Sequence, residues 1–596
     1  MDTGALPSNT PEPRHPRSSV LFGDAVRSIP PKIDLLIYAG IALCSLAQAL
    51  FGAYRMDADP VAYLDLSDAI RNGDWHSAFN AYWFPFYPTL LAAARAMFGF
   101  RMQYELMAAR LLDALLGLAF VAAAVILAAS VRRLILASGI REDELLPAPT
   151  LRLWVAVVAW FFVSLDLTNI KPDTLVSIFM ILAVAALFRA FIDDSIPAYI
   201  AAGLYGALAF WAKSFAFPFF LLWILLAALF HLRNLKILGR LALALFVFAA
   251  VSAPLVWQIS SSQGRFTFGT SGSLNLAWFV NRADRFNPVA DQAAWQPGSA
   301  AGNLIHPGDL LAKSPSISYY GRPHSVASTP QWDDPSYWFD GLKPRMVLRQ
   351  FFAEIRVNLR VLGSLAVMRF QVAALAALLG FWGFRMRRRS FAHPVVMMAL
   401  IQALACICLY VAVDLEPRYI AFAFVISATV YAACSLTPTP GADHRSLHAA
   451  ILIAAALLLL FGLQDTLRES KSGLAEGAQP LRGIYSMTTV SAAAELASLY
   501  PRETEVACMG DAACWLDPYW VRYGGLRMTA IVETGNGVTA KSAEEGCSKL
   551  AQNPAALDAL RKKNVRAIVA RFDGTQPCSS QWRPLGTSPN FFYLPL

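Results

Sequence analysis

Two carboxylates stand one residue apart where the first long apolar stretch of the chain ends. Asp57 and Asp59 follow residues 35–54, and a proline comes directly after them. Such a pair can take the proton of an acceptor hydroxyl, or hold a divalent cation such as Mg²⁺ or Mn²⁺ against a phosphate. Asp57 and Asp59 are therefore the candidate catalytic residues and the candidate metal ligands, and either of them can be the base.

A structural role for Asp59 is the alternative. An aspartate at the N-cap followed by a proline at the first helical position is a strong helix-start signal, and Asp59 and Pro60 fit it. This role leaves Asp57 unexplained, because Asp57 lies outside the predicted helix. The two roles are compatible, since the helix dipole keeps a capping carboxylate ionised and available to a ligand.

Charged and aromatic residues recur at the ends of later apolar stretches. Lys213 ends one stretch, Arg418 and Tyr419 begin another, and Lys171 and Asp173 flank a proline before a third. The cations among them can bind the phosphate of a lipid-linked substrate. The alternative for Lys213 is a lysine that anchors a helix end at the membrane surface. For Lys171 and Asp173, the alternative is that they only pair with each other or cap the span that follows.

Two further candidates for substrate binding have aromatic or imidazole side chains. Tyr63 falls on a helix predicted over 60–72, and His306 lies in a long polar stretch over 260–345. Loops longer than about 15 residues are often functional, and the aromatic-rich segment 332–338 can cover a site and stack on a sugar. Packing within the loop is the alternative for any single residue of it.

The composition indicates a membrane protein. Of the 596 residues, 56% are hydrophobic and 15% are charged, and the mean hydropathy is +0.45. A helix of about 20 apolar residues crosses a bilayer core of about 30 Å. The predicted fold class is a polytopic α-helical membrane protein with about eleven transmembrane helices and a small C-terminal extracytoplasmic α/β domain. The spans are predicted at 35–54, 106–129, 153–167, 174–191, 196–212, 217–230, 241–259, 362–384, 395–413, 420–436 and 447–463.

Basic residues set the expected orientation. They gather in the N-terminal tail and in alternate loops, which the positive-inside rule assigns to the cytosol. The net charge of +9 follows from this loop pattern, so we expect no nucleic-acid partner. With an odd number of spans, the C-terminal region lies outside the cytosol. The basic loops are at 132–133, 189, 233–240 and 385–389.

The expected organisation has three parts in an inner (plasma) membrane. A disordered cytosolic tail (1–32) precedes a transmembrane module (33–464), and a periplasmic or extracellular α/β domain (465–596) follows. The module has an outer loop with interfacial helices (55–104) and the long outer loop (260–345). In the C-terminal domain, helices are expected at 492–499 and 555–563, and strands at 505–508, 565–570 and 591–594.

Helical periodicity predicts that residues 60–72 form an interfacial helix. Its apolar residues fall on one face, and Asp65, Asp68 and Arg71 fall on the other. Such a helix lies along the membrane surface. Residues 90–100 are predicted to form a second one.

The C-terminal domain contains four cysteines. An even number of cysteines outside the cytosol favours two disulfides, whose pairing the sequence leaves open. A zinc site is the alternative, although a C-x-x-C spacing is missing. The four are Cys508, Cys514, Cys547 and Cys578.

Several familiar motifs are missing from the sequence. It has no P-loop, no Rossmann glycine fingerprint before a helix, no HExxH and no GxSxG. ATP-driven transport and zinc proteolysis therefore have no support.

The layout resembles the GT-C class of integral-membrane glycosyltransferases, nearest to the protein O-mannosyltransferase and aminoarabinose-transferase branch. Five stretches between about residues 34 and 436 carry the resemblance, in the family's order. Residues 59–67 (DPVAYLDLS) are similar to the acidic motif after the first span, 84–88 (FPFYP) to HPPLYP, 171–176 (KPDTLV) to RPDALL, 209–213 (AFWAK) to LAFLTK, and 417–419 (PRY) to PRYLLP.

This resemblance implies a membrane enzyme that moves a hexosyl or pentosyl group from a polyprenyl-phosphate donor to a glycan, lipid or protein acceptor outside the cytosol. It aligns Asp59 with the family's leading Asp, which is a base or a metal ligand, and makes basic residues at outer span ends the phosphate ligands. Pro60 replaces the usual Glu and Asp57 adds an acid upstream, which leaves open which Asp is the base and whether a metal is used.

Two other functions use the same substrates. A transporter or flippase of lipid-linked saccharides would need polar residues inside several spans, whereas the candidates here stand at span ends. An oligosaccharide ligase or polymerase usually relies on Arg and His in outer loops rather than on an acidic pair after the first span.

Overall fold

The structure is a computed structural model that describes most of the chain from residue 31 onward. The predicted cytosolic tail (1–32) lies almost entirely outside the described residues, and so does most of the span predicted at 362–384. The residues left undescribed are 1–30, 53–55, 165–166, 168, 286–302, 325–326, 331, 366–384, 387–393, 437–443, 478, 480–481, 483–486, 534–540, 573–576 and 589.

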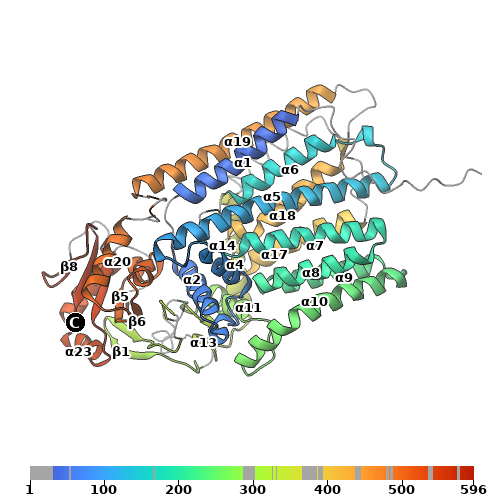
Figure 1. Ribbon diagram of the computed structural model, residues 1–596. Helices are drawn as coiled ribbons and strands as arrows, with labels where there is room; N and C mark the ends of the chain where they lie inside the picture. Colours follow the sequence, from blue (N-terminus) through green and yellow to red (C-terminus); the bar gives the residue numbers. More distant parts are fainter. Residues whose placement is uncertain are drawn as a thin grey trace, which may run out of the picture.

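Long apolar helices form a bundle, with a β-sheet at one end of it (Figure 1). Within the described residues, six helices are long and apolar enough to cross a membrane, and four more are shorter and apolar. The chain is therefore a multi-pass membrane protein, and the count of about eleven spans stays a prediction. The long helices are α5 (Glu105–Ala137), α7 (Asp173–Asp193), α10 (Leu235–Ser262), α17 (Pro394–Val413), α18 (Pro417–Cys434) and α19 (His444–Ala475); the shorter ones are α1 (Pro31–Phe51), α6 (Ala148–Val163), α8 (Ile196–Ala212) and α9 (Ala216–Phe230).

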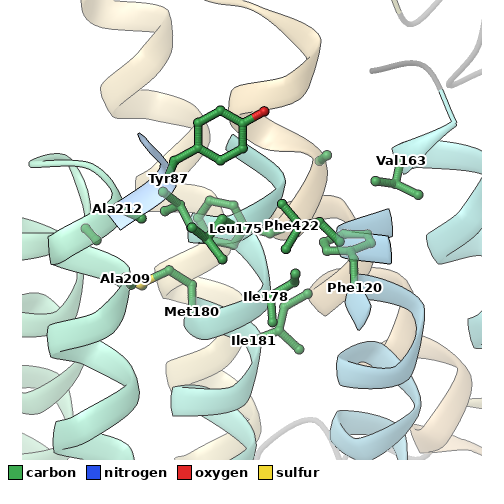
Figure 2. Close-up of a cluster of buried hydrophobic side chains, with 14 of the residues drawn as sticks. Tyr87, Phe120, Val163, Leu175, Ile178, Met180, Ile181, Ala209, Ala212 and Phe422 are labelled. Atoms are coloured by element: carbon green, nitrogen blue, oxygen red, sulfur yellow. The ribbon is translucent and has the colours of Figure 1, made fainter. Parts of the chain in front are cut away.

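Close side-chain packing holds the bundle together. Lipid tails are as apolar as the helices, so van der Waals contact and small interface residues drive association. Gly203 of α8 faces the main chain at Ala244 of α10, where an added Cβ would collide with the carbonyl oxygen. Figure 2 shows Phe120, Ile178 and Phe422, from α5, α7 and α18, in one buried cluster. α7 is thereby fixed at the centre of the bundle.

Short helices gather at the end of the bundle nearest the sheet (Figure 1). Helix α2 begins two residues earlier than predicted, so Asp57 and not Asp59 occupies the N-cap, and the Asp57 side chain makes no capping hydrogen bond. The prediction of Asp59 as the cap is wrong, because its carboxylate is bonded to other partners. The short helices are α2 (Ala58–Arg71), α3 (Trp75–Ala78), α4 (Phe86–Ala96), α11 (Ser271–Asn275), α13 (Pro335–Trp338) and α14 (Leu348–Leu365).

The acidic face of α2 is covered rather than open. Asp65 is 2% exposed and forms an ion pair with Arg522 from the C-terminal region. The expectation of a helix lying on the membrane surface with this charged side uncovered is therefore wrong at Asp65. An arginine from about 450 residues later in the chain, invisible to local periodicity, covers that side.

The sheet joins two distant parts of the chain. Its order is β1-β2-β6-β5-β7-β9-β8, with β5 parallel to both neighbours and the other pairs antiparallel. Strands β1 and β2 come from the long loop, and Ile317 of β2 lies in the same core as Val532 and Ile568. The loop and the C-terminal region thus share one hydrophobic core. The strands are β1 (Asp309–Lys313), β2 (Ser316–Tyr319), β5 (Glu505–Met509), β6 (Arg527–Glu533), β7 (Ala567–Arg571), β8 (Arg583–Pro584) and β9 (Phe591–Pro595).

The C-terminal region also carries four helices and both disulfides. Cys508 pairs with Cys514, and Cys547 with Cys578, which gives the pairing that the sequence left open. A short two-stranded sheet, β3 (Arg385–Met386) with β4 (Ser435–Leu436), lies apart from the main sheet. The helices are α20 (Met487–Leu499), α21 (Tyr519–Tyr523), α22 (Lys541–Ala551) and α23 (Pro554–Lys562).

Candidate active site

A cavity of about 560 Å³ lies at the end of the bundle that faces the sheet. We call it the main cavity. Its charged lining comes from the start of α2, the loop before α7, the end of α8 and the start of α18, so four segments remote in sequence meet there. The charged side chains that the argument uses are Asp57, Asp59, Lys171, Asp173, Lys213 and Arg418.

The acidic pair shares one lysine. Lys171 Nζ lies 3.1 Å from Asp57 Oδ2 and 3.3 Å from Asp59 Oδ2. Trp332 Nε1 donates a hydrogen bond of 2.7 Å to Asp59 Oδ1, so both oxygens of Asp59 are engaged. Among the described residues, Asp57 Oδ1 has no hydrogen-bond partner. The two carboxylates are therefore unequal: Asp59 is held on both oxygens, and Asp57 keeps one oxygen for a ligand.

A second charged group surrounds Asp173. Its carboxylate accepts a hydrogen bond of 2.6 Å from Lys213 Nζ and lies 3.2 Å from Arg418 Nε. The Tyr419 ring lies under both cations, 4.2 Å from Lys213 Nζ and 4.9 Å from the Arg418 guanidinium carbon. Lys213 and Arg418 thus both face the carboxylate of Asp173. Glu416 also pairs with Arg418, through Nη1 at 3.0 Å.

The ion pairs of Lys171 and Asp173 differ from one of the alternatives that the sequence left open. Lys171 and Asp173 were expected either to pair with each other or to serve a substrate, and Lys171 instead pairs with Asp57 and Asp59. Pro172 turns the chain between them, so the two side chains serve different groups. Asp173 begins α7 without a side-chain cap.

The pKa values of Asp57 and Asp59 shift in opposite directions. Burial and the repulsion of Asp59 raise the pKa of Asp57 above its ordinary value. Burial also acts to raise the pKa of Asp59, but Lys171 and Arg418 outweigh it and the pKa lies below its ordinary value. Lys171 itself has a raised pKa because the two carboxylates outweigh its burial.

Aromatic side chains form the wall next to the acids. The indole rings of Trp83 and Trp278 lie 6.0 Å and 5.7 Å from that of Trp332, and Trp515 of the C-terminal region lies 6.2 Å from it on another side. All four tryptophans line the cavity. The indole nitrogen of Trp278 is buried and has no hydrogen-bond partner within the described part of the chain. It is a donor available to a ligand hydroxyl.

A second part of the cavity lining is apolar. Phe215, Phe217, Phe268 and Tyr410 line it, with the rings of Phe215 and Tyr410 stacked at 3.9 Å and those of Phe217 and Phe268 at 4.2 Å. These residues stand at the ends of membrane helices, so this side of the cavity borders the bundle's apolar surface.

The structure brings together most of the predicted site residues. Tyr63 lines the cavity beside Trp83, with ring centroids 5.0 Å apart. His306 does not line it; its ring stacks on Tyr337 at 3.9 Å elsewhere in the long loop.

Reasoning from the sequence missed several lining residues. They stand alone in loops or in the C-terminal region, and their spacing carries no signal. The aromatic richness of 332–338 did point toward one further lining residue, Trp332. The missed residues are Trp278, Arg285, Asp414 and Trp515.

The residues at the acidic pair fit an ammonium better than a metal. Lys171 Nζ lies between the two carboxylates, where a divalent cation bridging them would lie. A search of the described residues finds no group of three or more His, Cys, Asp or Glu side chains placed to hold a metal ion. A divalent cation held by two carboxylates takes its remaining ligands from water and substrate phosphate, and here the Lys171 ammonium already pairs with both carboxylates.

Comparison with protein-family models and with curated proteins finds no match. Among solved structures, apo ArnT from Cupriavidus metallidurans superposes with a TM-score of 0.53 over 94% of this chain and 97% of ArnT, at 13% identity. The chain has an ArnT-like fold. The same ArnT bound to undecaprenyl phosphate gives a TM-score of 0.51 at 13% identity, over 95% of this chain and 98% of ArnT. The predicted likeness to the GT-C class is thus confirmed as a likeness of fold.

Proposed function

We propose that this protein is a membrane glycosyltransferase that moves a hexosyl or pentosyl group from a polyprenyl-phosphate donor to a hydroxyl of an acceptor outside the cytosol. The observation that carries the proposal is that the carboxylate pair and the Lys213–Arg418 pair line one cavity. The ArnT-like fold adds support, because ArnT has been solved with undecaprenyl phosphate bound. The acceptor class, whether glycan, lipid or protein, is left to experiment.

The cations hold the donor phosphate. Lys213 and Arg418 are positioned by Asp173 and by the Tyr419 ring, so they need little reorganisation when the phosphate departs. Fixed cations stabilise the charge that develops on a leaving phosphate in a site shielded from water. The planar guanidinium of Arg418 suits two phosphate oxygens at once.

Asp57 is the base in this proposal. Its Oδ1 is the carboxylate oxygen left without a partner among the described residues, and its raised pKa makes it the stronger base of the pair. The acceptor O–H gives its proton to Asp57, the oxygen bonds to the anomeric carbon, and the bond from that carbon to the phosphate oxygen breaks with its electron pair. Asp59, fixed by Lys171 and Trp332, positions Lys171 against Asp57.

The two walls match the two ends of the donor. The tryptophan wall next to the acids provides ring faces and the Trp278 N–H for a sugar, and the phenylalanine wall borders the membrane where the isoprenoid chain lies. A lipid-anchored donor reaches such a site sideways from the bilayer. Lys171 supplies the positive charge at the acid pair, so the proposed steps use no divalent cation, and activity should persist in EDTA.

We also propose that the site faces away from the cytosol of an inner (plasma) membrane. The two disulfides of the C-terminal region support this, since structural disulfides persist in oxidising compartments. Single added cysteines can test it: one at the exposed position 310 of the sheet end should react with a membrane-impermeant maleimide on intact spheroplasts, and one at the exposed position 235 of α10 should not. The reverse labelling would overturn the orientation.

The activity test uses purified protein, a polyprenyl-phosphate sugar and release of free polyprenyl phosphate as the readout. Asp57→Asn should lower the rate by about 10²–10⁴-fold, as for loss of a general base. The control Asp143→Asn changes an exposed carboxylate far from the cavity and should leave the rate unchanged. Equal rates in wild type and Asp57→Asn would sink the assignment of the base. Movement of the intact lipid-linked sugar across vesicles without turnover would favour a flippase instead.

A further inference from the structure

A second cavity, of about 430 Å³, lies at the other end of α2. It opens between the last turn of α2, the loop after α4 and the turns around residues 502 and 525 of the C-terminal region. We call it the arginine cleft. Five arginines line it: Arg71, Arg95, Arg502, Arg522 and Arg527. Arg71 lies twelve residues after Asp59, which is about 18 Å along a helix, so the cleft is separate from the main cavity.

The floor of the cleft is a buried network of ion pairs. The side chains of Arg95 and Arg522 are 3% and 4% exposed. Arg522 bonds Asp65 and Asp68 of α2 and Glu105 of α5, and Arg95 bonds Asp68 at 2.8 Å and Glu105 at 2.7 Å. This network fixes the C-terminal region against the helices, and its charges are largely neutralised.

The rim carries charge that the network does not neutralise. Arg71 lies over the Phe100 ring at 4.2 Å, and neither it nor Arg502 has a carboxylate partner among the described residues. Arg527 and Arg322 share the single carboxylate of Glu503. When the paired floor and the rim are counted together, six arginines face four carboxylates, and the excess of two positive charges belongs to Arg71 and Arg502 of the rim.

We propose that the arginine cleft binds a phosphate group carried on a small polar unit such as glycerol or a sugar. An excess of two positive charges suits a phosphate ester, either the dianion of a monoester or the monoanion of a lipid headgroup diester, and guanidinium forks bind phosphate oxygens in pairs. A cleft lined by one sign of charge also concentrates anions near its mouth. The cavity volume exceeds that of phosphate alone, so the attached unit fits inside as well. This proposal does not depend on the transferase reaction.

The phosphate can come from a lipid headgroup or from a soluble compound, and two probes separate them. Glycerol 3-phosphate is titrated into the protein in phosphatidylcholine nanodiscs. Retained phosphatidylglycerol is counted by native mass spectrometry after reconstitution with that lipid. Binding at the main cavity is common to every variant below, so only the difference between variants is interpreted.

The test variant is Arg71→Ala with Arg502→Ala. We expect its affinity for the preferred probe to fall about a hundredfold, roughly tenfold for each charged hydrogen-bonding partner. Loss of glycerol 3-phosphate binding would assign the cleft to a soluble phosphate, and loss of retained phosphatidylglycerol would assign it to a lipid headgroup. The matched control is Arg566→Ala with Arg583→Ala, two exposed arginines of the same region that do not line the cleft.

The proposal is overturned if both probes bind the test variant as tightly as the wild type. Thermal unfolding shows whether the test variant is folded. If it is not folded, the variant Arg71→Lys with Arg502→Lys replaces it. The two lysines keep the positive charge but lose the planar guanidinium. This variant should therefore bind the probe more weakly than the wild type and more tightly than the alanine variant would. Equal binding by the lysine variant and the wild type would then also overturn the proposal.

Discussion

Helix α2 has a charged cluster at each end, and the two clusters differ in how fully their hydrogen bonds are satisfied. At its far end, Arg522 uses all three nitrogens, with Asp65, Asp68 and Glu105 as partners. At its start, Asp57 keeps an oxygen without a described partner and is 47% exposed. Both clusters combine Asp or Glu with cations, so residue type alone does not distinguish them.

This difference in pairing distinguishes a charge cluster that stabilises the fold from one that can bind a substrate. A buried network pays a large desolvation penalty that only complete pairing offsets, and it has no capacity left for a ligand. A reactive site keeps incomplete pairing next to open volume, so a substrate can complete it. By this criterion the Arg522 network joins the C-terminal region to the bundle, and the main cavity is where we propose that the reaction takes place.

The largest effect is expected when the fully paired cluster around Arg522 is broken. Arg522→Ala should lower the free energy of unfolding by about 3–5 kcal/mol, because it leaves buried carboxylates without their counter-charge. Thermal unfolding in detergent measures it, with the exposed Arg566→Ala as the control. A variant with unchanged unfolding and abolished turnover would show that this cluster is catalytic and that the comparison fails.

The next largest effect is expected in the main cavity, where the charged residues are incompletely paired. Arg418→Ala should slow turnover by about 10²–10³-fold, the cost of removing one stabiliser of developing charge, with little change in unfolding temperature. Arg265→Ala, an exposed arginine paired at 3.7 Å with Asp340, is the matched control and should keep its activity. A large loss of stability in Arg418→Ala with normal turnover would assign this residue to structure.

A smaller effect sharpens the roles of the two aspartates. Trp332→Phe removes the N–H that bonds Asp59 and keeps an aromatic ring, so turnover should fall about tenfold, as for loss of one hydrogen bond to a charged group. The pKa of Asp59 should rise, because that bond helps to lower it. Trp338→Phe is the control, since its N–H bonds Asp333 away from the cavity. Equal losses in both variants would mean general loop damage.

The smallest effect is on pH dependence. Burial acts to lower the pKa of His324, but its bond to Asp333 raises it to about 9. A raised histidine pKa stabilises the fold below the ordinary value near 6.5, and that stabilisation is lost as pH rises through about 9. Turnover should therefore decline partially over pH 8–10, since Asn80 and Trp83 still hold the loop. His324→Gln should remove the decline. A pH profile of this variant identical to that of the wild type would exclude the histidine as the cause.

Sequence periodicity predicted the membrane helices well and the sheet only in part. The strands predicted at 505–508, 565–570 and 591–594 correspond to β5, β7 and β9. The predicted span 196–212 has the same bounds as α8 (Ile196–Ala212), because a long apolar run needs no partner to be recognised. Strand β6 (Arg527–Glu533) and the loop strands β1 and β2 were missed, since strand formation depends on neighbouring strands. Helix α14 (Leu348–Leu365), which is amphipathic, was also missed; it lies between the predicted long loop (260–345) and the predicted span 362–384, whose first residues it includes.

The amino-acid sequence by itself determined that the chain spans a membrane, and it placed acids and cations at the ends of spans on one side. Tertiary structure alone decided the partners: Lys171 with Asp57 and Asp59, Asp173 with Lys213, and Arg522 with the far end of α2. The reason is physical. Hydropathy is a local property of about 20 consecutive residues, whereas an ion pair depends on the packing of segments hundreds of residues apart.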